Sequence, residues 1–552
     1  MRFKHVLDES YKIILVLTVI SSLVLATGPR VRLVSANPAG LYNYEFTVDK
    51  EGFTTINIVY TTEETNGSSW VLVPKFTDWV NNTIRGTVTG WSVRDSSDVA
   101  NGTFSYFYEE LFFSFKSDNT EFQMDIQYNV TTAAMIIEPD GIFYSTQIGF
   151  ESGNKLEATV VFPSGFRVNE ALAFSLEPNG DSNSYSPSST SSTHVVFNDI
   201  PETENLLRIE IGFNSANQKP ELIKITNGIF TFETVSRYAE YARSILNLYN
   251  RTYNDLVDLF NVTLEEANVR FFIPDFESLL VIGGYTPFTS NRMGDININF
   301  VFTRSVEGYI EVIALHELVH HFLWKAGISP GALLWFHEGM AQYVSMEIAN
   351  KIGYEGAEMI TKEIDTAISQ LKMIVGEDFG FLQGWSMTNQ PQDVGSYYAA
   401  AYYVVRSIAE NRGGLAYYAR FFRLMHGETI TSNSELGYYL SLASEESVAT
   451  YLNSWGFNVP DLYLYSPLLG NVKKVIEEVN PLYQPYKYLA ELLYEQALSN
   501  VRQESLSELH FYLSAAIIVA KLAPLLTTIT VSGVLFTIIL MLLKRKGVFW
   551  NY

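Results

Sequence analysis

The chain has 552 residues, of which 47% are hydrophobic and 18% are charged, a composition typical of a folded protein with several domains. Its formal net charge is −23, which argues against nucleic acid as a partner because nucleic-acid-binding surfaces are basic. It contains no cysteine, and this excludes disulfide bonds, thiolate metal ligands and a cysteine nucleophile.

An apolar run near the N-terminus, Ile13–Ala26, follows a short segment that contains Arg2, Lys4 and Lys12. Basic residues followed by a short apolar core are typical of a secretory signal peptide or an uncleaved N-terminal anchor. We assign residues 1–37 to this segment.

A second apolar run, Leu522–Leu543, contains 22 uncharged residues and is followed by the basic residues Lys544–Lys546. This length suffices to cross a bilayer, and the basic residues favour the cytoplasmic side. We therefore predict a single-pass cell-membrane protein, with a transmembrane helix within 515–543, a cytoplasmic tail over 544–552 and the rest of the mature chain outside the cell. A buried core helix is the alternative interpretation of this run.

Six N-x-[ST] sequons lie between the two apolar runs, as expected for a glycosylated external domain. Each sequon alone is weak evidence because the pattern is common by chance. The candidate glycosylation sites are Asn66, Asn81, Asn101, Asn129, Asn250 and Asn261.

Residues 38–216 are predicted to form an antiparallel β-sandwich domain. The segments 122–130 and 156–162 alternate apolar and polar residues, which is the pattern of half-buried strands. The Ser-rich stretch 179–193 is predicted to be a surface loop. No catalytic constellation lies in this domain, so we expect a structural or substrate-presenting module.

The next domain, residues 217–460, is predicted to mix strands with helices. Helical periodicity from Val235 to Phe260 predicts a long amphipathic helix. A strand over 268–274 and a turn over 283–287 follow. A second strand over 294–300 is expected to line the metal cleft, where a strand edge can bind an extended peptide. An ordinary interior strand is the alternative, and Asp295, Asn297 and Asn299 are the predicted substrate-binding residues on this segment.

Further helices are predicted over 354–374 and from Ser396 onward. A helical stalk over 461–514, including one helix over 487–509, is expected to connect the ectodomain to the membrane.

The motif His316-Glu317-Leu318-Val319-His320 carries the chemistry of the chain. Histidines four residues apart on a helix share a face, so His316 and His320 can bind one metal ion. Glu317 lies beside that face, where it can act as a general base on a metal-bound water. The neighbouring His321 lies off the metal face.

A third ligand is predicted 18 positions after His320, at Glu338. Two histidines and one glutamate with an open fourth position are the ligands of a catalytic zinc ion. We therefore predict one Zn²⁺ per chain, which lowers the pKa of a bound water to about 7. The alternative is a core helix whose histidines are satisfied by hydrogen bonds within the protein, together with a glutamate that caps a helix.

Two further groups complete the predicted site. The oxyanion that forms during hydrolysis needs a second hydrogen-bond donor, and Tyr397 and Tyr398 are the candidate pair, with core packing as the alternative. His337 adjoins the third ligand and is predicted to hydrogen-bond a substrate or a neighbouring side chain, with simple packing as the alternative.

At HELVHH and WFHEGMAQYVS the sequence resembles the gluzincin metallopeptidases, the thermolysin-like clan that includes the aminopeptidase N family. In that family the second helix has the form W-[LF]-N-E-G-[FM]-A, and its Glu is the third zinc ligand. This pattern matches Trp335–Ala341, with His337 in place of the usual Asn. The family's catalytic Tyr lies around sixty positions beyond the zinc Glu, and Tyr397 and Tyr398 lie 59 and 60 positions beyond Glu338. The resemblance therefore favours this pair, with Tyr398 slightly ahead.

The resemblance covers residues 265–425, and it implies a thermolysin-like α+β domain with a helical C-terminal half. The family's G-[AG]-M-E-N motif, whose acid holds the free amino group of a substrate, is absent. Residues 283–287 (GGYTP) stand in its place. The choice between an aminopeptidase and an endopeptidase therefore stays open.

The sequence thus predicts an α+β multidomain protein: a membrane-anchored, extracellular zinc metallopeptidase that acts on a peptide or protein substrate. A non-catalytic cell-surface glycoprotein that retains the peptidase scaffold is the alternative. Nothing in the sequence predicts the oligomeric state.

Overall fold

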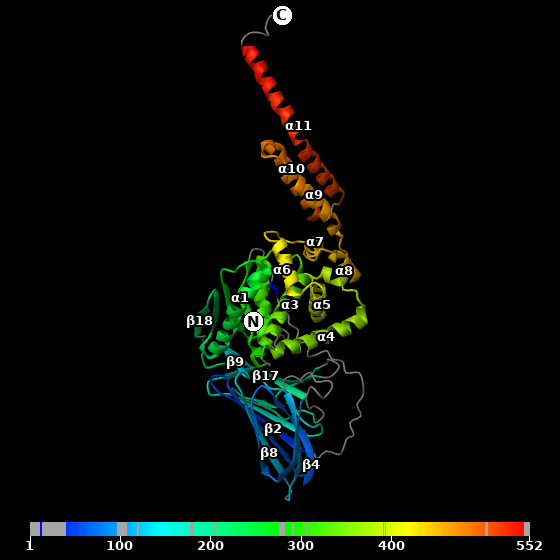
Figure 1. Cartoon of the computed structure of the whole chain (residues 1–552). Coiled ribbons are helices and arrows are strands. Elements are labelled where there is room, and N and C mark those ends of the chain that lie inside the picture. Colours follow the sequence, from blue (N-terminus) through cyan, green and yellow to red (C-terminus); the bar gives the residue numbers. More distant parts are fainter. Residues whose placement is uncertain are drawn as a thin grey trace.

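The computed structural model describes residues 12–13, 40–95, 108–118, 121–176, 182–201, 206–217, 219, 221–274, 282–289, 292–304, 307–389, 391, 393–502 and 506–545. These residues form an elongated molecule with three parts in a row (Figure 1). A β-rich domain lies at one end, a mixed domain lies in the middle, and a set of helices projects from the other end. The predicted N-terminal segment 1–37 lies outside the described residues apart from Lys12 and Ile13.

The described residues of the N-terminal domain form strands joined by turns and loops, without a helix. They are β2 (Gly40–Val48), β3 (Thr54–Thr62), β4 (Asn66–Pro74), β5 (Trp79–Arg85), β6 (Thr87–Asp95), β7 (Tyr108–Lys116), β8 (Phe122–Val130), β9 (Ala134–Ile137), β10 (Asp140–Tyr144), β11 (Ile148–Gly149), β12 (Lys155–Val161), β13 (Arg167–Leu176), β14 (Ser182–Tyr185), β15 (Ser189–Thr190), β16 (His194–Phe197) and β17 (Leu206–Asn214). One sheet has the order β15-β16-β12-β2-β3-β8-β5, a second β14-β13-β17-β10-β9, and a third β4-β7-β6.

Alternating apolar residues on these strands enclose one core, as their period of two requires. Tyr44 on β2, Ile58 on β3 and Ile211 on β17 are all fully buried in it. The predicted β-rich domain is therefore confirmed, but it is not purely antiparallel, because β2 and β12 pair in parallel. Part of the Ser-rich stretch predicted as a loop forms the short strands β14 and β15.

The middle domain packs helices against a mixed sheet. Its elements are β18 (Leu222–Asn227), β19 (Phe230–Val235), η2 (Ser236–Tyr238), α1 (Ala239–Phe260), β20 (Ala267–Phe272), β21 (Gly284–Thr289), β22 (Arg292–Met293), β23 (Ile296–Asn299), η3 (Phe300–Arg304), α2 (Tyr309–Lys325), α3 (Leu334–Ile352), α4 (Glu355–Val375), η4 (Gly380–Gly384), α5 (Val394–Glu410), α6 (Leu415–Leu424), α7 (Asn433–Ser444) and α8 (Val448–Ser454). The sheet order is β1-β21-β23-β20-β19-β18, where β1 is Lys12–Ile13 and β22 pairs with β21.

The sheet differs from the sequence prediction at two strands. Residues 284–287, predicted as part of a turn, belong to strand β21, which pairs with β23. Strand β23 lies between β21 and β20, and all four of its residues are buried. It is therefore the interior strand of the two alternatives, with no free edge for a peptide, because both of its sides are already paired.

Two helices hold the predicted motif at the centre of this domain. Helix α2 is apolar on almost every side, so it is buried on almost every side. The hydroxyl of Tyr249 on α1 donates a hydrogen bond of 2.7 Å to the carbonyl of Ala314, which fixes α2 against α1. Helix α3 then packs against both α2 and α5, so the motif is held between helices and is not on a surface loop.

Three helices and two short 3-10 turns form the projecting end. They are η5 (Leu462–Tyr465), α9 (Ser466–Glu477), η6 (Pro481–Tyr483), α10 (Gln484–Arg502) and α11 (Leu506–Arg545). The single helix predicted over 487–509 is wrong, because α10 ends at Arg502 and α11 then packs alongside it. Small and apolar side chains of α11, such as Leu513, Ala516 and Ala520, fill the contact with α9 and α10.

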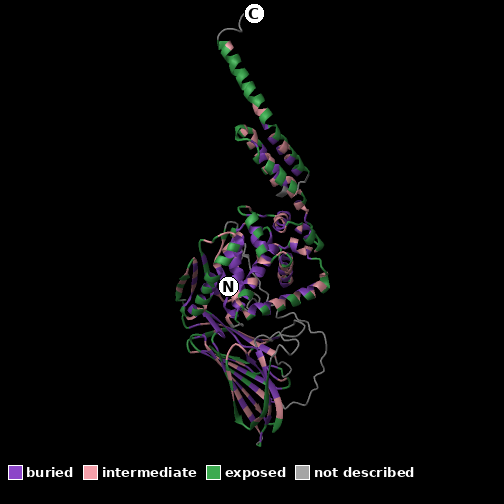
Figure 2. Cartoon of the chain, in the orientation of Figure 1, coloured by how far each residue is buried: buried purple, intermediate pink, exposed green. Residues whose placement is uncertain are grey.

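The C-terminal end of α11, after Thr530, extends beyond its neighbours and is largely exposed (Figure 2). Among the described residues, this is the one helix that is long and apolar enough to cross a membrane, with a candidate span of Ser507–Arg545. Its existence agrees with the helix predicted over 515–543.

Candidate metal centre

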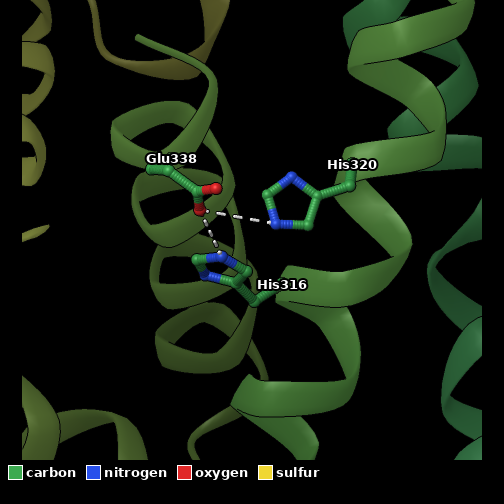
Figure 3. A group of neighbouring side chains, drawn as sticks. All are labelled: His316, His320 and Glu338. Atoms are coloured by element: carbon green, nitrogen blue, oxygen red, sulfur yellow. Dashed lines mark hydrogen bonds and ion pairs between the residues drawn. The ribbon is translucent and has the colours of Figure 1, made fainter. Parts of the chain in front are cut away.

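Three side chains from two facing helices converge on one point (Figure 3). His316 and His320 lie one turn apart on α2, and Glu338 reaches them from α3. The Oε2 atom of Glu338 lies 3.4 Å from His316 Nε2 and 3.5 Å from His320 Nε2. All three ligand atoms lie within 4.8 Å of one another, which leaves room for one shared ion.

The environment of this triad fits a metal ion. All three side chains are fully buried, and neither His320 Nε2 nor Glu338 Oε1 has a hydrogen-bond partner. Burial lowers the pKa of His316 to about 3 and raises the pKa of Glu338 well above its usual value. Buried polar atoms without partners are costly, and two neutral imidazoles with one carboxylate are the donors that zinc takes in catalytic sites. The residues present therefore fit one zinc ion.

Glu317 lies beside the triad and is held from one side only. Its Oε2 accepts a hydrogen bond of 2.9 Å from the hydroxyl of Thr286 on β21, and its Oε1 has no hydrogen-bond partner. Burial raises the pKa of Glu317 well above its usual value, and the bond from Thr286 opposes that rise. One carboxylate oxygen is thus anchored and the other is left available for a proton.

Strand β21 approaches Glu317 more closely than most residues would permit. A β-carbon on Gly284 would lie 2.7 Å from Glu317 Oε1 and 2.9 Å from its Cγ. Gly284 is therefore required by close contact, and it sets the distance between β21 and α2. Neither Gly284 nor Thr286 is predicted from the sequence, because residues 283–287 are predicted as a turn, although the Tyr, Thr and Phe residues of 285–289 are typical of a strand.

His337 hydrogen-bonds a neighbouring side chain, which is one of the two roles predicted for it. It is fully buried, its Nδ1 lies 2.8 Å from His320 Nδ1, and the two rings stack at 4.7 Å. This bond fixes the outer nitrogen of the ligand His320, so that the inner nitrogen faces Glu338. Such a partner orients the ligand ring, and the substitution of His for the family's usual Asn keeps a hydrogen-bonding group here.

The three polar residues predicted to bind substrate on segment 294–300 have other partners. Asn297 Nδ2 donates to the carbonyls of Asp295 and Tyr285, and Asn299 Nδ2 donates to that of Ile282, at 2.7 to 3.3 Å. Asp295 forms an ion pair with Arg270. These side chains thus join strands within the sheet, in contrast to the substrate contact predicted from the sequence.

Tyr397 and Tyr398 both lie in the first turns of α5 and are half-buried. The ring of Tyr397 contacts Phe381 at 4.7 Å and Trp385 at 5.6 Å, and the ring of Tyr398 contacts Trp385 at 5.0 Å. The metal cluster found among the described residues does not include His321, which agrees with its predicted place off the metal face.

Helix α5 is brought close to the third ligand by Gly339. A β-carbon on Gly339 would lie 2.5 Å from the carbonyl oxygen of Ala401. The neighbour of Glu338 is thus in direct contact with α5, one turn after the tyrosine pair.

Five of the six sequons lie among the described residues. Asn66, Asn129 and Asn250 are exposed, and Asn81 and Asn261 are half-buried. Asn101 lies outside the described part of the chain.

No family model matches the sequence, and no curated protein matches it. Comparison with solved structures does return matches. Leukotriene A4 hydrolase from Saccharomyces cerevisiae is 12% identical over 90% of this chain and 89% of its own, with a TM-score of 0.32. An M1 zinc metallopeptidase from Deinococcus radiodurans bound to a Tyr-Ser-Ala substrate is 15% identical over 77% of this chain and 95% of its own, with a TM-score of 0.29.

Aminopeptidase A of Legionella pneumophila is 12% identical over 76% of this chain and 49% of its own, with a TM-score of 0.28.

Proposed function

We propose that this protein is a zinc metallopeptidase, anchored in the cell membrane by α11, whose catalytic domain faces the outside of the cell. The observation that carries this proposal is the buried cluster of His316, His320 and Glu338 beside a glutamate with one free oxygen. This donor set, with an adjacent carboxylate, is the arrangement used for metal-assisted hydrolysis of amide bonds.

The residues of the chain divide the work of hydrolysis among them. His316, His320 and Glu338 would hold the zinc ion, which would supply polarisation of a carbonyl group and a lowered pKa of a bound water. Glu317 Oε1 accepts the proton of the attacking water and later delivers it to the leaving amine. Thr286 holds Oε2 of the same carboxylate throughout.

The developing oxyanion needs a hydrogen-bond donor from the protein. We assign this role to the hydroxyl of Tyr398, with Tyr397 as its neighbour on the same helix turn. Their position on α5, which Gly339 brings against α3, supports the assignment.

Three observations support the external location. The apolar half of α11 ends in Lys544 and Arg545, which favour the cytoplasmic side. The sequons Asn66, Asn129 and Asn250 are exposed, so each can accept a glycan. The N-terminal run 13–26 has the composition of a signal sequence or an anchor.

Replacing Glu317 with Gln tests the proposal. We expect the purified wild-type chain to cleave members of a peptide library, and Glu317→Gln to lose that activity by several orders of magnitude while zinc stays bound, because the three ligands are unchanged. The cleavage positions relative to each peptide's N-terminus will distinguish an aminopeptidase from an endopeptidase. Equal cleavage by the variant would contradict the assigned role of Glu317.

A further inference from the structure

The projecting helices carry a feature that the peptidase site does not explain. The tip of the connection between α9 and α10, residues 479–486, is uncharged, with the exposed Glu477 and Glu478 directly before it and Lys487 directly after it. Leu482 at its tip is 79% exposed, and Tyr488 just beyond it is 57% exposed. Exposed apolar side chains at the end of a helical hairpin indicate that something other than water covers them.

The position of this turn along α11 can be compared with the part of α11 that is expected to lie in the bilayer. The hydrocarbon core is about 30 Å thick, which corresponds to about 20 helical residues. If Lys544 marks its cytoplasmic boundary, the core begins near Pro524. Lys521 is exposed and is the last charged residue before this point, which agrees with a boundary there.

The turn between α9 and α10 reaches past that boundary. The hydroxyl of Tyr486 lies 2.5 Å from the hydroxyl of Thr530. Thr530 lies 14 residues before Lys544, or about 21 Å along the helix, and hence about 9 Å inside the outer boundary of the core. A side chain of the turn is therefore bonded to α11 at a depth that belongs to the bilayer.

The chemistry of the turn suits the boundary between lipid headgroups and acyl chains. Tyrosines gather at this level because each has an apolar ring and a polar hydroxyl, and Tyr483, Tyr486 and Tyr488 all lie on the turn or directly after it. Lys487 directs its ammonium group back to the carbonyls of Glu477 and Val479, at 3.5 and 3.4 Å. Its charge is thus drawn away from the tip.

We propose that the turn between α9 and α10 inserts into the outer interface of the bilayer that α11 crosses. It forms a second point of attachment beside the transmembrane helix. Because α10 packs along α11 and contacts α7 of the middle domain, two attachment points fix the height and tilt of the catalytic domain above the membrane. This inference rests on the membrane anchoring in the proposed function. It adds a second, lipid-facing surface to that anchoring.

The absence of cysteine from the chain makes single-cysteine labelling unambiguous. Three single-cysteine variants of the full-length protein are each labelled with one environment-sensitive fluorophore and reconstituted in phosphatidylcholine vesicles. Leu482→Cys places the label at the tip of the turn. Met373→Cys, on the exposed face of α4 and 80% exposed, is the matched aqueous control. Phe536→Cys, in the exposed C-terminal end of α11, reports on membrane crossing itself.

Quenching is measured with iodide in water and with nitroxide-labelled lipids. We expect iodide to quench the label at 482 about fivefold less than the label at 373, and shallow nitroxide lipids to quench it strongly, because an interfacial site is shielded from water. The label at 536 should be shielded from iodide even more.

Three outcomes would overturn the proposal. If the label at 536 is shielded but the label at 482 is as open to iodide as that at 373, α11 crosses the membrane and the turn does not insert. If 482 is shielded from iodide but not quenched by nitroxide lipid, a second copy of the chain or another protein covers it. If 536 itself is open to iodide, the membrane anchoring fails together with the inference drawn from it.

Discussion

Glu317 is positioned by two residues of β21 that have different functions. Gly284 lets the strand approach, since any side chain there would collide with the carboxylate. Thr286 supplies the single hydrogen bond that holds Oε2. A general base works best when its orientation is set before the substrate arrives, so the threonine hydroxyl should matter to turnover more than to binding.

Thr286→Val removes this hydroxyl and keeps the size of the side chain. We expect kcat for peptide cleavage to fall about 10- to 100-fold, the range for losing a hydrogen bond to a charged group, with little change in KM or in zinc content. Thr286→Ser keeps the hydroxyl and should restore most of the activity. A loss of equal size in the serine variant would contradict the role of the hydroxyl.

His337 acts on the zinc ligand in a comparable way. It bonds the outer nitrogen of His320 inside a fully buried site, and its ring stacks on the ligand ring. Partners of this kind commonly contribute a factor of about 10 to 100 in metal affinity.

We therefore expect His337→Leu to weaken zinc binding about 10- to 100-fold, measured by competition with a chelator of known affinity. His337→Asn keeps a hydrogen-bonding group and should recover most of that affinity. His321→Leu is the control, because His321 lies next to His320 but outside the metal cluster. If all three variants bind zinc equally well, His337 does not orient the ligand.

At the scale of single residues, the sequence predicted the metal ligands but not the side chains that hydrogen-bond to the ligands and to Glu317. The ligands follow from a four-residue helical spacing and a recognisable second motif, both of which are local. Thr286 lies 31 residues before Glu317, and its contact exists only because β21 packs against α2. The same holds for His320 and His337, whose bond depends on how two helices face each other.

Helices α3 and α5 pack closely against each other at Gly339. Gly339 touches the backbone of Ala401, which any β-carbon would push away. Because Glu338 precedes Gly339 and the tyrosine pair precedes Ala401, this contact couples the third ligand to the proposed oxyanion donor.

Gly339→Ala should lower the free energy of unfolding by about 1–3 kcal/mol, the usual cost of overpacking, and should weaken zinc binding as α3 shifts. Thermal unfolding with and without added zinc measures both effects. Gly470→Ala is the matched control, since Gly470 lies in α9 with nothing within 4 Å of its added β-carbon. There alanine should leave stability unchanged or raise it slightly. A Gly339→Ala protein as stable as the wild type would show that the two helices have room to separate.

Periodicity predicted most individual elements correctly. The long helix α1, the motif helix α2 and the strand β8 all follow from regular spacing of apolar residues. Periodicity did not predict the bounds of elements where the apolar pattern is short or where one helical pattern runs on into the next. Residues 284–287 of strand β21 are predicted as part of a turn because Gly283 and Gly284 are adjacent, and the end of α10 at Arg502 falls within an unbroken helical pattern.

On the scale of the whole molecule, the three parts lie in the order in which they occur in the chain (Figure 1). The β domain lies at the end opposite α11, so it is the part farthest from the proposed membrane. The metal centre lies between them, inside the middle domain.

The overall arrangement was only partly accessible from the sequence. The apolar C-terminal run and the β-rich first domain were predicted, because each has a strong compositional signature. The packing of α9, α10 and α11 against one another was not predicted. It depends on contacts between helices, and the apolar pattern of each helix alone does not indicate which helix it contacts.

The zinc content of the purified full-length chain tests the central claim most directly. Metal analysis by mass spectrometry should find one zinc per chain in the wild type and in Glu317→Gln, and much less in His320→Ala and in Glu338→Ala, because each of these loses one of three ligands. A wild-type chain that holds no zinc, even after incubation with the ion, would contradict the account. So would ligand variants that bind zinc as tightly as the wild type.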